Sequence, residues 1–342
     1  MGRDTMERPP EPLPLRHGMY TGAPEMEPIL RLIERAARTD CTVLVRGETG
    51  SGKELVARAI HAASARARRP FLAVNCATLS PTLLESELFG HVRGAFTGAI
   101  ADHDGLFKRA DKGTLFLDEI AEMPLDIQAR LLRVLEDRTF VPLGGTKPVR
   151  SDVRLISATH RALRDETAAG RFREDLRYRI RVVPLFLPPL RERTGDVERL
   201  VWRLIERGNE GGLRRIDGVR RAAMELLVRH PWPGNVRELR NVIEYAYVVG
   251  DGPVLELADL PPELRGEPPP GRRARSLAER ERERIVAALD AHRGHKGEAA
   301  RALGISRSTL WRKLYQHGLE ARPASDVGRE LGQRAGSNVN PA

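Results

Sequence analysis

The first part of the chain whose residues are suited to chemistry is a glycine-rich segment, which lies between an apolar run and an amphipathic stretch. Its spacing matches a phosphate-binding loop: glycines let backbone N–H groups turn toward phosphates, the following helix adds a positive dipole, and the lysine supplies a point charge. A glycine-rich turn without a ligand is the alternative. The residues expected to bind nucleotide are Gly47, Glu48, Thr49, Gly50, Ser51, Gly52, Lys53 and Glu54.

A pair of acids, Asp118 and Glu119, ends a second apolar run. Asp118 is suited to hold Mg²⁺, directly or through water, and Glu119 to orient and polarise an attacking water. Paired acids at a strand end also occur as a helix N-cap and its neighbour. Combined with the upstream phosphate loop, however, the pair predicts hydrolysis of ATP with Mg²⁺ as cofactor.

These groups need a scaffold, and short apolar runs bounded by turn or helix signals predict one. Such runs are typical of buried parallel strands separated by helices, which indicates an α/β core. The last run would lie at a sheet edge because Pro184 lacks an N–H. The strands are expected at residues 42–46, 71–74, 114–117, 153–157 and 182–187, and helices of a small subdomain at residues 197–207, 219–229 and 236–249.

The composition fits a soluble globular protein: 41% of the 342 residues are hydrophobic and 30% are charged. The net charge is +10, and residues 271–322 hold 13 Lys and Arg against 6 Asp and Glu, which favours nucleic acid as a partner of this segment. Cys41 and Cys76 lie in apolar runs, typical of reduced core cysteines. Without a signal pattern or a membrane-length apolar run, we expect a cytoplasmic protein with no membrane contact.

The motifs together resemble the AAA+ domain of sigma-54-dependent activators, also called bacterial enhancer-binding proteins, over about residues 21–319. The most specific motif is GAFTGA at 94–99, which in that family inserts into the AAA+ core and contacts sigma-54. Its glycine-flanked small residues suit a mobile contact tip better than a strand; a loop without function is the alternative. In that family Glu usually follows the phosphate-loop lysine, as Glu54 does here. The resemblance implies sigma-54 contacts by Gly94, Ala95, Phe96, Thr97, Gly98 and Ala99.

Other site residues follow from the same resemblance. Asn75 resembles the residue that holds the catalytic glutamate until contacts change. Arg237, in the segment Trp232-Pro-Gly-Asn-Val-Arg, resembles the sensor II arginine that faces the nucleotide from the lid. His160 stands at the sensor I position, where the family more often has Asn, and it can still hydrogen-bond.

The segment at 172–180 resembles the subunit interface of the family. Arg173 and Arg179 would be arginine fingers that reach the γ-phosphate of a neighbouring protomer, and Arg177 could share this role. Exposed arginines on a helix are the alternative. Because the fingers act in trans, the resemblance implies a homo-oligomeric ring, commonly a hexamer.

Residues 297–314 predict a helix–turn–helix similar to the Fis-type domain that ends many family members. Gly304 makes the turn and Ser306 caps the second helix. Ile305, Leu310 and Leu314 would pack inward, and residues 277–289 would form a preceding helix. A purely structural three-helix bundle is the alternative. The residues expected to contact double-stranded DNA are Arg307, Ser308, Thr309, Arg312 and Lys313.

The expected function is ATP-driven remodelling of sigma-54 RNA polymerase from closed to open complex by an activator bound to upstream DNA. Two alternatives stay open: another AAA+ machine, such as an unfoldase or helicase, and a DNA-bound regulator with a degenerate ATPase core. Within this sequence we expect no receiver or ligand-sensing domain before the core, so regulation is expected from a partner, from expression level or from a segment outside the sequence. The expected domains are an arm at 1–20, the AAA+ α/β core at 21–188, its helical lid at 189–250, a linker at 251–276, the DNA-binding domain at 277–320 and a disordered tail at 321–342.

Overall fold

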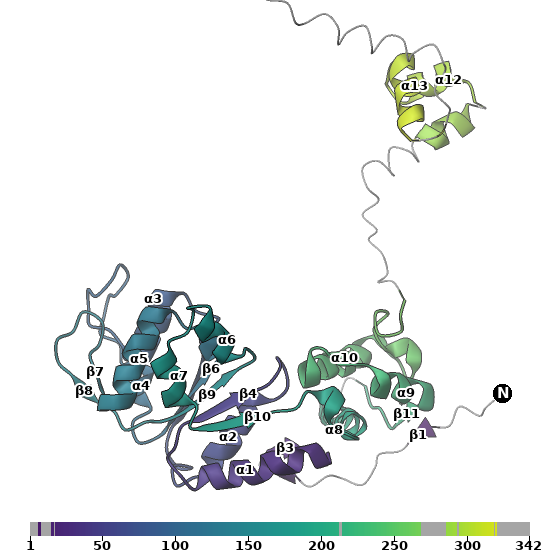
Figure 1. The fold of residues 1–342 in the computed structure, drawn as a ribbon. Coiled ribbons are helices and arrows are strands. Elements are labelled where there is room, and N and C mark those ends of the chain that lie inside the picture. The colour runs from purple at the N-terminus through teal and green to yellow at the C-terminus, as the bar shows by residue number, and fades with distance from the viewer. Residues whose placement is uncertain are drawn as a thin grey trace, which may run out of the picture. The chain divides into compact units, whose positions relative to one another are not determined.

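A computed structural model describes residues 6–7, 15–16, 18–211, 214–267, 285–292, 294–317 and 319. Contacts divide the chain into two units, Met1–Glu267 and Pro268–Ala342. The first unit, shown with its element labels in Figure 1, holds the phosphate loop and the acidic pair. The second holds the helix–turn–helix.

A five-stranded sheet forms the core of the first unit, in the order β10-β4-β9-β6-β5 with all neighbours parallel. The predicted strands are confirmed to within two residues at each end, and with them the α/β fold. β10 lies at the edge, as Pro184 required. The strands are β4 (Val43–Arg46), β5 (Phe71–Asn75), β6 (Thr114–Asp118), β9 (Arg154–Thr159) and β10 (Val183–Phe186).

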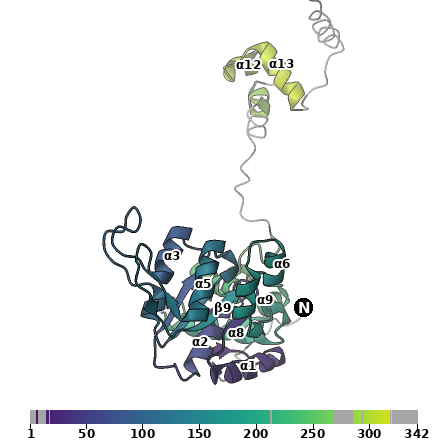
Figure 2. The ribbon, with the colours of Figure 1, turned by 60° about the vertical axis from the view of Figure 1, so that its left-hand side comes forward.

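Alternate residues of the central strands face opposite sides of the sheet, and helices cover both (Figure 2). Leu115 and Leu117 of β6 pack with α3, α5 and α7, whereas Phe116 packs with α1 and α2. This two-sided burial explains the continuous apolar runs of the strands. The covering helices are α1 (Glu27–Ala37), α2 (Lys53–Ala62), α3 (Pro81–Phe89), α5 (Leu125–Asp137) and α7 (Glu174–Ile180), with the short helices α4 (Leu106–Arg109) and α6 (Leu163–Ala168) between them.

The chain between α3 and α4 projects from the core in both views (Figures 1 and 2). At its base His91 and His103 exchange backbone hydrogen bonds of 3.0 and 2.9 Å. Val92 N donates to Leu143 O, at 3.0 Å, in the hairpin of β7 (Thr139–Phe140) and β8 (Val149–Arg150). The base of the projecting loop is therefore fixed on two sides.

Three helices form the lid, as the amphipathic pattern predicted: α8 (Asp196–Glu210), α9 (Arg221–Arg229) and α10 (Asn235–Val249). The expected start of α9 at residue 219 is wrong. Residues Gly218–Arg220 form strand β11, which pairs with β1 (Met6–Glu7) and β12 (Val254–Leu255). Backbone pairing with distant segments thus takes precedence there over the local helical pattern.

Residues 251–267, expected to begin a linker, pack onto the lid. Leu255, Leu260 and Leu264 are buried in the hydrophobic core of the lid. These apolar residues between the prolines cover an apolar surface of the lid helices, so the segment packs against the lid. The rest of the expected linker, at 268–276, lies outside the described residues, as do 277–284 and the tail at 321–342.

The N-terminal arm has ordered contacts with the lid. It contains β1, β2 (Leu15–Arg16) and β3 (Met19–Tyr20). Just after β3, Thr21 Oγ1 donates to Asp196 Oδ2 at 2.6 Å, and the N–H groups of the next two residues donate to Oδ1. Asp196, the first residue of α8, thereby ties the segment that directly follows the arm to the lid.

In the second unit, helices α12 (Lys296–Ala302) and α13 (Arg307–Gln316) pack with a helical segment at 285–291. Leu310 and Leu314 are buried there, as expected. Neither cysteine forms a disulfide: Cys41 is half-buried, while burial raises the pKa of Cys76 to about 12. Among the described residues, no helix is long and apolar enough to span a membrane.

Candidate nucleotide site and contact surfaces

The glycine-rich loop joins the end of β4 to the start of α2. Gly50 and Gly52 have φ values of +78° and +106°, which favour glycine. At Gly50 a Cβ atom would lie only 2.2 Å from Gly234 O of the lid, so that position has no room for a side chain. Lys53 is 7% exposed; its Nζ donates to Gly47 O at 3.1 Å and to Glu119 Oε1 at 3.0 Å. The loop and the acidic pair therefore form one site.

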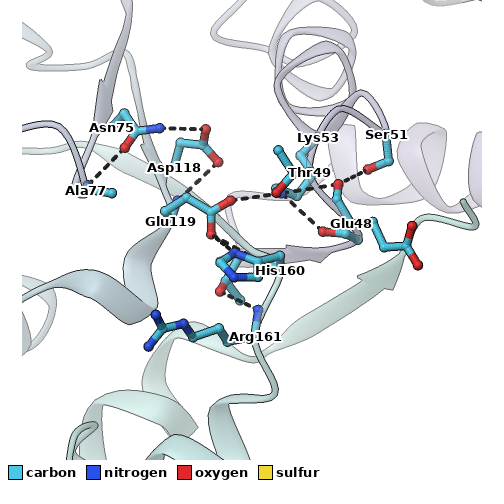
Figure 3. Close-up of polar contacts among 12 residues, drawn as sticks. Glu48, Thr49, Ser51, Lys53, Asn75, Ala77, Asp118, Glu119, His160 and Arg161 are labelled. Atoms are coloured by element: carbon cyan, nitrogen blue, oxygen red, sulfur yellow. Dashed lines mark hydrogen bonds and ion pairs between the residues drawn. The ribbon is translucent and has the colours of Figure 1, made fainter. Parts of the chain in front are cut away.

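Asn75 lies beside Asp118 in this site (Figure 3). Its Nδ2 donates to Asp118 Oδ2 at 3.2 Å, and its Oδ1 accepts from Ala77 N at 2.9 Å. The expected contact between Asn75 and Glu119 is not present. The register of β5 and β6 pairs Asn75 with Asp118, while Glu119 lies beyond the strand end with φ +51°.

His160, directly after β9, holds Glu119 instead (Figure 3). Its Nδ1 lies 2.6 Å and its backbone N 3.2 Å from Glu119 Oε2. Burial raises the pKa of Glu119, but the hydrogen bonds from His160 and Lys53 outweigh it, and the pKa lies below its usual value. Burial, and then the charge of Glu119, raise the pKa of Asp118. The site thus favours an ionised, doubly anchored Glu119.

The donor set near Asp118 fits Mg²⁺. This ion usually takes one or two protein carboxylates and completes its shell with phosphate oxygens and water. The described residues contain no cluster of three or more His, Cys, Asp or Glu side chains that could hold a metal alone. Glu54 does not belong to the donor set near Asp118, because its carboxylate pairs with Arg58 on the exposed face of α2, at 2.7 Å.

Lid residues also reach the phosphate loop. The expected nucleotide contact Arg237 is exposed and lies beside Gly50, and its side chain forms no hydrogen bond or ion pair within the described part of the chain. Arg191, Arg193 and Asn235, which the sequence did not single out, bind the loop directly. In the sequence this region is marked by its resemblance to sensor II, which singles out Arg237 and gives no indication of these contacts.

The expected arginine fingers lie on or beside α7. Arg173 is ion-paired with Asp175 at 2.7 Å, and Arg179 Nη2 donates to Leu135 O at 2.8 Å. Arg177 pairs with Glu174 at 3.0 Å and stacks on the next aromatic ring. Within the described residues, none of the three side chains bonds to the phosphate loop of its own chain.

Only part of the GAFTGA loop is exposed to solvent. Thr97 is exposed between turns at Gly94 and Gly98, whose φ values are +83° and +105°. Phe96 packs edge-on against the His91 ring at 5.0 Å, and Ala99 is buried. Next to the motif, Ile100 is 83% exposed, a feature the motif did not indicate.

The second unit has the expected helix–turn–helix geometry. Gly304 has φ +69°, and Ser306 Oγ accepts from Thr309 N at 3.1 Å as an N-cap. Trp311, not among the predicted contacts, is 37% exposed, and Lys296 Nζ lies 4.2 Å from the centre of its ring. Of the expected DNA contacts, the exposed residues are Arg307, Ser308 and Arg312, and the partly buried ones are Thr309 and Lys313.

Comparisons with known proteins cover the same three parts. Residues 19–186 match the family described as Sigma-54 interaction domain, 191–277 the AAA+ ATPase lid domain, and 276–317 the bacterial regulatory proteins of the Fis family. The chain is 48% identical over 302 residues to the transcriptional regulatory protein ZraR of Klebsiella oxytoca, covering 87% of this chain and 68% of that one. It is 40% identical over 370 residues to the DNA-binding transcriptional regulator NtrC of Rhizobium meliloti, covering 95% and 76%. The crystal structure of NtrX from Brucella abortus in complex with ATP matches with a TM-score of 0.70 at 38% identity, covering 88% and 69%.

Proposed function

The chain belongs to the sigma-54-dependent transcription activators, and on this basis we propose that it couples ATP hydrolysis to opening of the sigma-54 promoter complex. It is an activator with an AAA+ ATPase core, a helical lid and a Fis-type DNA-binding domain. Family membership decides against an unfoldase or helicase. The joined Lys53 and Glu119 site argues against a degenerate ATPase core.

The proposed chemistry uses the site residues in distinct roles. Lys53 places its charge at the terminal phosphates, and Arg237 approaches the nucleotide from the lid. Glu119, oriented by His160, polarises the attacking water, because its carboxylate is ionised and held at both oxygens. Asp118, oriented by the Asn75 amide, would hold Mg²⁺, which would neutralise developing charge on the phosphates.

A ring supplies the remaining catalytic charge in this proposal. Arg173 and Arg179 lie on the surface of their own chain, and the side chain of each has one partner within the described ranges. We assign them to the γ-phosphate of the adjacent protomer, which requires an oligomer, most simply a hexamer. The DNA-binding unit would hold this ring on upstream double-stranded DNA and raise its local concentration near the promoter.

The single observation that carries the proposed output is the exposed Thr97 at the tip of a loop whose base is anchored on two sides. Movement of the core would be transmitted through such a base to the tip. A tip with glycine turns on both sides of one hydroxyl offers a small surface to a protein partner.

Thr97→Ala is expected to keep ATPase activity and ring formation, but to lose binding to sigma-54 in the presence of ADP and aluminium fluoride. Loss of one contact worth about 1–3 kcal/mol weakens a transient complex by roughly ten- to a hundred-fold. A gel shift of sigma-54, run beside ATPase rates, measures this. Thr82→Ala, an exposed threonine on neighbouring α3, is the matched control. Normal sigma-54 binding by the Thr97 variant contradicts the loop assignment.

A further inference from the structure

The outer side of the phosphate loop is bound by a set of lid contacts centred on Glu48. Its side chain points away from Asp118 and Glu119 (Figure 3). Arg191 donates to both of its carboxylate oxygens, at 2.9 and 2.7 Å, and Asn235 Nδ2 donates to Oε2 at 3.1 Å. Hydrogen bonds from these two residues lower the pKa of Glu48, so the contact is made with a carboxylate.

Asn235 is the buried centre of this set, with an exposed fraction of 0%. Its Nδ2 also donates to Thr49 O at 3.1 Å, and its Oδ1 accepts from Leu190 N at 2.7 Å. One carboxamide therefore connects the phosphate loop, the Leu190 turn and the first residue of α10. Buried amides satisfied on both sides fix the segments they join, because an unpaired group there is costly.

Two further bonds hold the same side of the loop. Val236 N donates to Gly50 O at 3.1 Å, and Arg193 Nη2 donates to Ser51 O at 2.7 Å. Oxygen atoms of residues 48–51 are thus committed to the lid. A phosphate loop whose outer side is held in this way is preorganised for its ligand.

We propose that Asn235 is a positioning residue for the ATPase reaction: with Arg191 it latches Glu48 and so couples the conformation of the phosphate loop to the position of the lid. The inference rests on the proposed ATP hydrolysis at this loop. Coupling between two sites is reciprocal. A nucleotide that changes the conformation of the loop therefore changes how tightly Glu48 is bound by Arg191 and Asn235 of the lid. Movement of the lid in turn changes the affinity for nucleotide.

A purely local role for Asn235 makes a different prediction. Its φ is +54°, a conformation that Asn and Gly both adopt. If only the backbone mattered, Asn235→Gly would leave the site intact. If the side chain is the latch, the same change removes it without introducing backbone strain.

The experiment measures the affinity for a fluorescent methylanthraniloyl-ATP, together with kcat and KM for ATP, on the full chain. Asn235→Gly is expected to weaken binding and raise KM about tenfold, with a smaller effect on kcat, because the reacting groups are untouched. Asn235→Asp should weaken nucleotide binding further, because the new carboxylate would face the carboxylate of Glu48. Adding Glu48→Gln should restore most of that loss by returning an amide to the pair.

Asn241→Asp, on an exposed part of the same helix, is the matched control and should behave as wild type. Wild-type affinity in Asn235→Gly, or no rescue of Asn235→Asp by Glu48→Gln, overturns the latch. A wild-type protein that neither binds nor hydrolyses ATP contradicts the proposed function instead, so the two failures are distinguishable.

Discussion

Arg179→Ala is expected to lower ATP hydrolysis by about 10³–10⁵-fold while nucleotide binding stays close to wild type. Among the residues that the structure describes, its guanidinium has one polar contact, the carbonyl of Leu135, and it lies on the surface. Removing this side chain should therefore change the stability of the chain little. In the proposed ring, the loss would fall on a neighbouring site, where this charge would stabilise the γ-phosphate during transfer.

Mixing tests this trans role. Rings containing both Arg179→Ala and Lys53→Ala subunits should form some sites that combine an intact Lys53 with an intact Arg179, and should regain part of the activity. Arg181→Ala, an exposed arginine directly after α7, is the control and should retain its activity. Mixed rings that assemble but stay inactive would show that Arg179 does not act across the interface.

The second large effect concerns Glu119→Gln, expected to reduce the hydrolysis rate by about 10²–10⁴-fold with ATP still bound. The amide keeps the shape of the side chain but cannot polarise water as the carboxylate does. The structure gives the carboxylate two anchors, Lys53 at 3.0 Å and His160 at 2.6 Å, and their hydrogen bonds keep its pKa low.

Steady-state ATPase rates and nucleotide titrations on the purified variant check this expectation. Glu122→Gln is the matched control: that carboxylate pairs at 2.7 Å with Arg161, the residue that follows His160. A Glu119 variant with near-normal turnover would remove the residue from its proposed role. Loss of ATP binding instead would indicate a structural contribution through Lys53.

The scaffold could be predicted from the sequence because its signals are local. Apolar runs gave the five strands, Pro184 placed one at the edge, and glycine spacing marked the phosphate loop. The partner of Asn75 could not be predicted, because it depends on the register between β5 and β6. The sequence indicates that His160 can form a hydrogen bond, but its 2.6 Å contact with Glu119 depends on β9 lying beside β6.

The contacts of the lid show more clearly which features a single sequence does not predict. In one sequence, Arg191 and Arg193 cannot be distinguished from ordinary surface arginines, yet the first binds Glu48 and the second is 8% exposed against Ser51. The strand at Gly218–Arg220 exists because segments some 200 residues earlier and 35 residues later pair with it. Local patterns carry no information about such distant partners.

Promoter opening is the most direct test of the central claim. The full chain is incubated at high concentration with a supercoiled sigma-54 promoter and sigma-54 RNA polymerase, and unpaired thymines are probed with permanganate. Opening is expected with ATP but not with a non-hydrolysable analogue, and the chain should not stimulate opening when polymerase carries the main sigma factor on its own promoter. Opening by sigma-54 polymerase without hydrolysis, stimulation of the main sigma factor, or no opening by a protein that hydrolyses ATP would each contradict the account.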